Sequence, residues 1–178
     1  MTDVLVTGDL TVEGIVTGGS SGSTSLKIAV LSDQRPSGTN GGDSLTNNYC
    51  SKPVNTVVDP HNLIDFDEPN GRFKINEPGT YYIEAFASTF RTNRNKLVLA
   101  DWSNNVALTG TSCFNLTSGE GGHMSYIQDI LIVTPETVKY RVLHYTERRQ
   151  TINGLGHPTS QAGLNELYMN LTIIKISD

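Results

Sequence analysis

Short apolar segments with alternating side chains, interrupted at close intervals by turn sequences, restrict the fold of this chain more than any other feature. Turns such as Asp59-Pro60, Glu77-Pro78-Gly79 and Thr134-Pro135 separate the segments, as is typical of antiparallel strands. No stretch of ten or more residues has the spacing of an amphipathic helix. We therefore predict an all-β antiparallel sandwich or jelly roll. The predicted strands cover residues 26–31, 55–58, 63–66, 73–75, 80–90, 96–102, 106–111, 123–133, 138–145 and 166–176.

Side-chain alternation in two of these strands indicates two faces with different roles. One face is apolar and is assigned to the core. The core-facing residues are Tyr81, Ile83, Ala85 and Ala87 in the first strand and Leu167, Met169, Leu171 and Ile173 in the second. The opposite faces mix aromatic with polar side chains, which suits a contact between subunits; scattered surface aromatics are the alternative. The predicted trimer-interface residues are Tyr82, Phe86, Phe90, Tyr168 and Ile174.

The first 18 residues form a separate segment. Val6-Thr7-Gly8 recurs as Val16-Thr17-Gly18, and β-branched residues interrupted by glycine indicate very short strands with repeated turns. Such a segment cannot bury its apolar side chains alone, whereas three copies wound about one axis can. We predict a trimeric stalk over residues 1–18 that docks on another protein; a flexible valine-rich leader is the alternative. The predicted docking residues are Val4, Val6, Leu10, Val12 and Ile15.

Residues 19–25, GSSGSTS, are a Gly/Ser linker and mark the one clear boundary in the sequence. Residues 26–178 are long enough for one domain with its own core. We therefore predict a stalk, a linker and a single globular head.

Charge and hydropathy exclude several classes of function. The net charge of −5 argues against binding to a phosphate backbone, so no nucleic-acid partner is expected. No apolar run approaches the length of a membrane span, and the N-terminus lacks the pattern of a signal peptide. We expect synthesis in a cytoplasm. Cys50 and Cys113 either form a disulfide or, as we favour, remain two reduced thiols.

Sequence motifs for catalysis are missing. The sequence has no nucleophile elbow, HExxH or Walker loop, and the four histidines lack the spacing of a zinc site. His144 shares strand parity with Tyr140 and Val142 and is expected in the core or an interface. A glycan depolymerase would need a clustered carboxylate pair, and Asp65 and Asp67 alone offer one. We therefore expect no enzymatic activity and no cofactor.

Residues 71–85, GRFKINEPGTYYIEA, follow the pattern G-x-F-x-[LI]-x-x-P-G-x-Y-x-[IF]. This block resembles the C1q/TNF-like jelly-roll domain; its Pro-Gly makes a turn and its alternating Tyr and Ile side chains enter the core. Residues 140–145, Asn153-Gly154-Leu155-Gly156 and residues 166–175 are similar to the end of the phage and bacterial versions of this domain. Residues 6–14, VTGDLTVEG, resemble the V-x-G-D-L-T-V-x-G segments of phage fibres.

The resemblance implies a homotrimer, because members of the family are nearly always trimers packed about an axis through aromatic and apolar side chains. It also makes calcium at the trimer apex conceivable, and Asp65, Asp67 and Glu68 offer oxygen ligands without an EF-hand pattern. The chain has neither a collagen-like Gly-X-Y stalk nor a signal peptide, so a secreted immune or hormone role is not expected.

Together these features predict a bacteriophage virion protein made in the host cytoplasm. In one hypothesis it is a tail-fibre or receptor-binding protein whose head binds a host surface glycan or protein through the loops around Arg148, Arg149 and Asn153. In the other it is a capsid decoration protein that stabilises the head lattice, which the short segment before the head favours.

Overall fold

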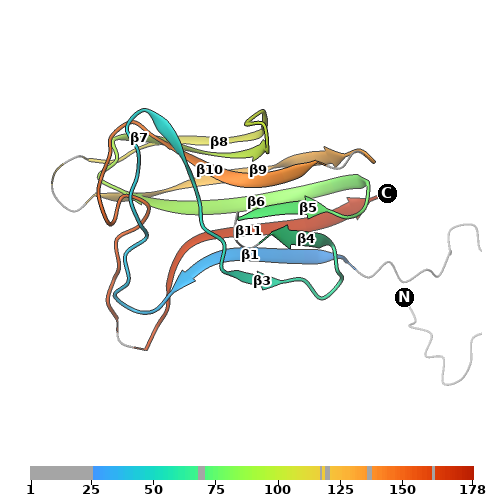
Figure 1. Ribbon diagram of the computed structural model, residues 1–178, viewed down its shortest axis with the longest axis horizontal. Coiled ribbons are helices and arrows are strands. Elements are labelled where there is room, and N and C mark those ends of the chain that lie inside the picture. Colours follow the sequence, from blue (N-terminus) through green and yellow to red (C-terminus); the bar gives the residue numbers. More distant parts are fainter. Residues whose placement is uncertain (1–25, 68–70, 117, 119–120, 136–137, 162) are drawn as a thin grey trace, which may run out of the picture.

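The chain folds into two antiparallel β-sheets packed face to face (Figure 1). The computed structural model describes residues 26–67, 71–116, 118, 121–135, 138–161 and 163–178. These residues contain strands and turns but no helix. The strands are β1 (Ile28–Arg35), β2 (Asn48–Ser51), β3 (Thr56–Val58), β4 (Ile64–Asp67), β5 (Arg72–Ile75), β6 (Gly79–Phe90), β7 (Arg94–Asp101), β8 (Val106–Phe114), β9 (Gly122–Val133), β10 (Lys139–Thr146) and β11 (Glu166–Ser177).

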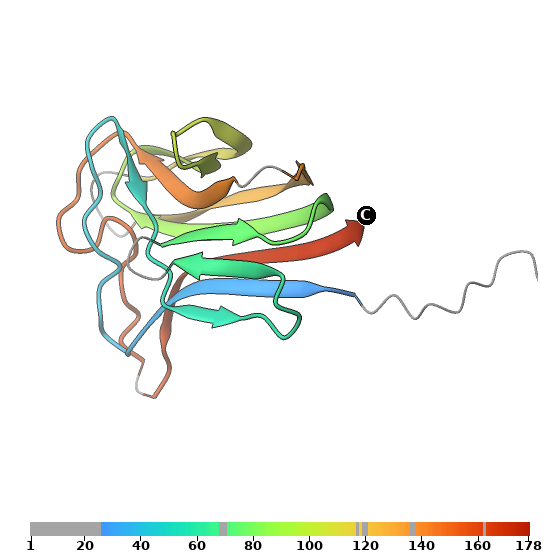
Figure 2. The ribbon, with the colours of Figure 1, turned by 45° about the vertical axis from the view of Figure 1, so that its right-hand side comes forward.

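The strand order brings distant parts of the sequence together. One sheet has the order β3-β1-β11-β6-β9, and the other has the order β4-β5-β10-β7-β8, with β2 paired to β10 outside that path. The first strand therefore pairs with the last, from Ile28 opposite Ile174 to Arg35 opposite Glu166. Figure 2 shows β4 and β5 in front of β1 and β11, as two layers require.

The predicted side-chain parity of β6 is confirmed. Tyr81, Ile83, Ala85 and Ala87 are all 0% exposed. Their side chains meet the inner face of the second sheet, where Leu97 and Leu99 of β7 belong to the same buried cluster. The core is therefore formed by alternate residues of both sheets, as in other sandwiches.

The predicted parity of β11 is wrong at its first residues. Leu167, expected in the core, is 44% exposed, whereas Tyr168 is 3% exposed. The cause is an irregularity in the pairing with β1, where Asp33 pairs with Met169 but the next residue, Gln34, pairs with Leu167. The additional residue on β11 is Tyr168, and a bulge of this kind reverses the facing of the side chains before it.

Most predicted strands are present with shifted ends. The first strand extends beyond Leu31 to Arg35, and β8 extends beyond Thr111 to Phe114. Strand β2 was not predicted, because its sequence, NYCS, has no apolar alternation of its own. It forms because β10 offers a free side to which residues 48–51 can pair.

The two ends of the sandwich differ in what they carry. The chain enters β1 at one end, where the C-terminus also lies, and the segments 36–47, 147–161 and 163–165 lie at the opposite end (Figure 1). At the first end Glu77 accepts hydrogen bonds from Lys27 at 2.5 Å and from Lys175 at 2.8 Å. These contacts lower the pKa of Glu77 to about 2. We call the opposite end, formed by residues 36–47, 147–161 and 163–165, the loop end. The predicted stalk and linker lie outside the described residues.

Candidate functional site

The outer face of the five-stranded sheet is unusually apolar. Strand β9 places four large apolar side chains on it, and they are between 39% and 73% exposed. They are Met124, Tyr126, Ile130 and Ile132. Exposed apolar groups gathered on one face, rather than scattered singly, indicate a contact surface.

These side chains continue across the sheet in rows. Tyr82 of β6 pairs with Ile130 on one side and with Ile174 on the other. Phe86 pairs with Tyr126, and the centres of their rings are 6.5 Å apart. Between the two rows the amide of Gln128 donates a hydrogen bond to Glu84 at 3.3 Å. The face therefore has two apolar rows separated by a polar one, and we call it the apolar face.

Three of the five predicted interface residues lie on the apolar face, and two do not. Tyr82, Phe86 and Ile174 are half-buried there. Phe90 is 7% exposed, because its ring packs 4.6 Å from the ring of His157. Tyr168 is turned inward by the bulge in β11, and its hydroxyl donates a hydrogen bond to the carbonyl of Thr39 at 2.7 Å. The assignments of Phe90 and Tyr168 to an interface are corrected accordingly.

The β9 side chains were missed in the sequence although a signal was present. Met124, Tyr126, Ile130 and Ile132 share one parity within the predicted strand 123–133. Ile127, Leu131 and Val133 have the opposite parity and are buried. Because both parities are apolar, alternation alone does not tell which faces the core.

The predicted receptor residues lie together at the loop end. The guanidinium of Arg149 donates a hydrogen bond to Asp43 at 3.2 Å, and Asn153 accepts one from the amide of Gln150 at 3.2 Å. Arg148 is exposed. Between them Ile152 is 63% exposed with φ 71, a left-handed conformation that is unfavourable for a β-branched residue. Asp43 holds it there by accepting a hydrogen bond from its backbone N–H.

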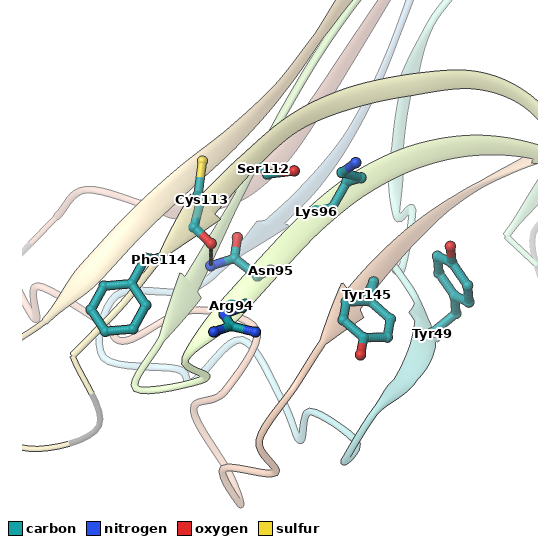
Figure 3. Close-up of a pocket in the computed structure, with 8 residues that line it drawn as sticks. All are labelled: Tyr49, Arg94, Asn95, Lys96, Ser112, Cys113, Phe114 and Tyr145. Atoms are coloured by element: carbon teal, nitrogen blue, oxygen red, sulfur yellow. Dashed lines mark hydrogen bonds between the residues drawn. The ribbon is translucent and has the colours of Figure 1, made fainter.

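A groove opens on the outer face of the six-stranded sheet, close to the loop end. Its volume is about 530 Å³, and none of its eight lining residues is acidic. Tyr49, Tyr145, Lys96 and Ser112 form its floor as a single row across four paired strands. Figure 3 shows Arg94 and Lys96 between Phe114 on one side and the two tyrosines on the other. We call this the cationic groove.

A buried polar cluster fixes the strand beneath the groove. Asn95 lies between Arg94 and Lys96 in the sequence, and its side chain points inward. Its Oδ1 accepts hydrogen bonds from Ser125 at 2.6 Å and from Nε2 of His144 at 3.2 Å. Burial, and then the nearby Lys52, lower the pKa of His144 well below its usual value. The His144 side chain therefore remains uncharged. Because the cluster holds Asn95 facing the core, its neighbours Arg94 and Lys96 face outward.

Known proteins resemble this chain in structure. Neither the protein-family models nor the curated proteins match the sequence. Among solved structures, the globular domain of zebrafish complement 1qA has a TM-score of 0.53 at 18% identity, covering 84% of this chain and 97% of that chain. Murine APRIL has a TM-score of 0.56 at 9% identity, covering 85% and 100% of the two chains. Eiger TNF from S. frugiperda has a TM-score of 0.55 at 12% identity, covering 86% and 94%. The fold is the C1q/TNF-like jelly roll.

The block that resembled this jelly roll in sequence has a clear structural role. Phe73 packs against Tyr140 with the ring centres 6.0 Å apart, and the hydroxyl of Tyr81 donates a hydrogen bond to the carbonyl of Glu77 at 2.8 Å. Gly79 has φ 145, and a Cβ there would lie 2.5 Å from the carbonyl oxygen of Ser177. The turn into β6 therefore requires glycine, because the end of β11 lies against it.

The described part of the jelly roll contains no group of three His, Cys, Asp or Glu side chains that could hold a metal ion. Glu68 lies outside the described residues, so calcium stays a prediction. Cys50 is buried and Cys113 is half-buried, and both are free thiols. None of the described segments is a helix suited to crossing a membrane.

Proposed function

We propose that this chain is a non-enzymatic protein of a bacteriophage particle that assembles as a homotrimer and binds the host surface. The observation that carries the proposal is the apolar face. Tyr82, Tyr126 and Ile130 would be covered if three copies packed about an axis along this face, and the desolvated area would stabilise the assembly. The fold supports this arrangement, because the sequence resemblance implied trimers of this kind.

The two ends of the jelly roll suit two different roles, attachment to the virion at one end and binding of the host surface at the other. The chain enters β1 at the end away from the loop end (Figure 1). An N-terminal segment docked on a virion protein through Val6, Leu10 and Val12 would therefore present the loop end outward. Arg148, Arg149 and the strained Ile152 lie at that end. A host surface glycan or protein is the proposed ligand.

Sedimentation velocity tests the trimer. Full-length protein should sediment as a trimer at micromolar concentration. Ile130→Glu, which places a charge on the apolar face, should shift the protein to monomer. Val106→Glu is the matched control, because Val106 is 48% exposed and Ile130 is 45% exposed but Val106 lies on the other sheet. A wild-type monomer, or equal dissociation by both variants, would contradict the proposal.

Particle assembly tests the virion location. Deletion of residues 1–24 should leave a folded jelly roll that no longer incorporates into particles, and circular dichroism would verify that it folds. If the truncated protein does not fold, the boundary at residues 19–25 is wrong. If it incorporates normally, docking through the N-terminal segment is wrong.

Quantitative mass spectrometry and adsorption assays separate the host-binding function from capsid decoration. For a host-binding protein we expect tens of copies per particle or fewer, and Arg148→Ala with Arg149→Ala should weaken adsorption to cells without reducing incorporation. Hundreds of copies, together with normal adsorption and reduced heat resistance of the particles, would instead establish a decoration protein.

A further inference from the structure

We infer that the cationic groove is a binding site for an acidic sugar, a pyranose ring that carries a carboxylate. The inference deepens the proposed host-binding function and rests on it for the source of the ligand. The groove is distinct from the predicted receptor loop of Arg148, Arg149 and Asn153. The floor of the groove belongs to the six-stranded sheet, whereas the apolar face belongs to the five-stranded sheet.

The electrostatics of the groove favour an anion. The chain as a whole has a net charge of −5, yet Arg94 and Lys96, two residues apart on β7, both line the groove (Figure 3). Glu147 approaches Arg94 with 3.8 Å between Nη1 and Oε1, and it also accepts hydrogen bonds from Asn93 and from the backbone N–H of Arg94. Lys96 makes no ion pair within the described residues. Lys96 can therefore pair with an anionic ligand without first breaking an ion pair of its own.

The aromatic side chains favour a ring over a bare anion. Tyr49 is 42% exposed and Phe114 is 56% exposed, on opposite sides of the two cations. The rings of Tyr49 and Tyr145 pack edge to face with their centres 5.6 Å apart, which orients both rings. The negative faces of such rings attract the weakly positive C–H groups of a sugar. Hydroxyls of Ser112 and the tyrosines can exchange hydrogen bonds with sugar hydroxyls.

The floor of the groove argues against an extended peptide. Tyr145 pairs with Tyr49 on one side and with Lys96 on the other, and Lys96 pairs with Ser112. The backbone groups of Tyr145 and Lys96 are therefore engaged on both sides, whereas Tyr49 and Ser112 lie on the outermost strands of the groove. A peptide added as a strand needs a free sheet edge, and the centre of the groove floor, at Tyr145 and Lys96, provides side chains alone. Its volume of about 530 Å³ is within the usual range for small-molecule clefts.

Isothermal titration calorimetry with full-length protein tests the site. The probes are oligogalacturonate, which represents an acidic polysaccharide, and 3-deoxy-octulosonate, which represents a lipopolysaccharide core; a neutral malto-oligosaccharide is the reference. At least one acidic probe should bind, with affinity that falls as sodium chloride is added, and the neutral sugar should not bind. The probe that binds identifies the source of the ligand.

Variants connect binding to the groove. Lys96→Gln and Arg94→Gln should each weaken binding about fivefold to tenfold, and Tyr49→Ala should weaken it as well. Lys139→Gln is the matched control, since it removes the same charge from an exposed position at the far end of β10. Glu147→Gln should strengthen binding, because it releases Arg94 while keeping an oxygen to accept hydrogen bonds.

Three results would overturn the inference: no binding of either acidic probe at millimolar concentration, equal binding of the neutral sugar, or equal loss in Lys139→Gln. An acidic peptide that binds where the sugars do not would assign the groove to a protein partner. None of these measurements depends on the trimer or on particle incorporation. Failure of the sugar-binding inference can therefore be told apart from failure of the proposed function.

Discussion

The ammonium group of Lys52 lies inside the sandwich and donates a hydrogen bond to the backbone carbonyl of Leu155, 2.9 Å away. Lys52 follows β2 directly, and Leu155 belongs to the loop end, so this contact connects two segments that are distant in sequence. A second carbonyl, that of Ser88, lies 3.4 Å from the same nitrogen. Burial lowers the pKa of Lys52 to about 7, although the nearby Asp33 opposes this shift.

The lowered pKa of Lys52 predicts that the free energy of unfolding increases with pH. Between pH 7 and about 10.4, the usual pKa of lysine, the unfolded chain binds more protons at this residue than the folded chain does. Stability must therefore rise over that interval and fall as the pH returns towards 7. Urea denaturation at several pH values should show this slope in the wild-type protein, and Lys52→Met should reduce it. Equal slopes in both proteins would assign the pH dependence to other groups.

The contacts of Glu77 predict that the protein loses stability in acid. Hydrogen bonds from Lys175 and Lys27 lower the pKa of Glu77 to about 2. Its contribution is therefore present above about pH 4.3, the ordinary glutamate value, and is lost as the pH falls towards 2. The free energy of unfolding of Glu77→Gln should therefore change less between pH 5 and pH 2 than that of the wild-type protein. Thermal denaturation at these two pH values, with Glu84→Gln as a second carboxylate variant of the same sheet, provides the check.

The packing of Ile83 predicts a large cost for its truncation. Ile83 is 0% exposed at the centre of β6, so Ile83→Ala should destabilise the protein by about 2–5 kcal/mol through lost burial and the cavity left behind. Val57→Ala, on the edge strand β3 and 37% exposed, should change stability by less than about 0.5 kcal/mol. Chemical denaturation measures both. A shift for Ile83→Ala as small as that of the control would mean that the assignment of the core face is wrong.

The contact between Gly156 and Tyr168 predicts that two glycines with positive φ tolerate alanine differently. Gly156 has φ 147, and a Cβ there would lie 2.0 Å from the ring of Tyr168. Gly42 has φ 104 with nothing within 4 Å. Both alanine variants acquire backbone strain, but Gly156→Ala must also displace the ring, at a further cost of about 1–3 kcal/mol. Denaturation midpoints that are equal for the two variants would show that the ring moves freely.

Strand parity is predictable where neighbouring residues in one strand differ clearly in polarity. The alternation of Tyr81, Ile83 and Ala85 with a face that contains Glu84 and Ser88 is enough to identify the core face of β6. The same reasoning fails at Leu167, since the extra residue in β11 arises from pairing with β1 and leaves no mark in the local sequence. It is also insufficient for Ile130, because both faces of β9 are apolar.

The sequence by itself determined the fold class, the positions of most strands and the turn at Pro78-Gly79, because these depend on local alternation and on backbone conformations that few residues adopt. The tertiary structure decided the composition of the candidate sites. Tyr49, Lys96, Ser112 and Tyr145 lie on four different strands, and they become one row only through the pairing of β2, β10, β7 and β8. That pairing is selected by the free energy of packing the whole core, to which residues far apart in the chain contribute together.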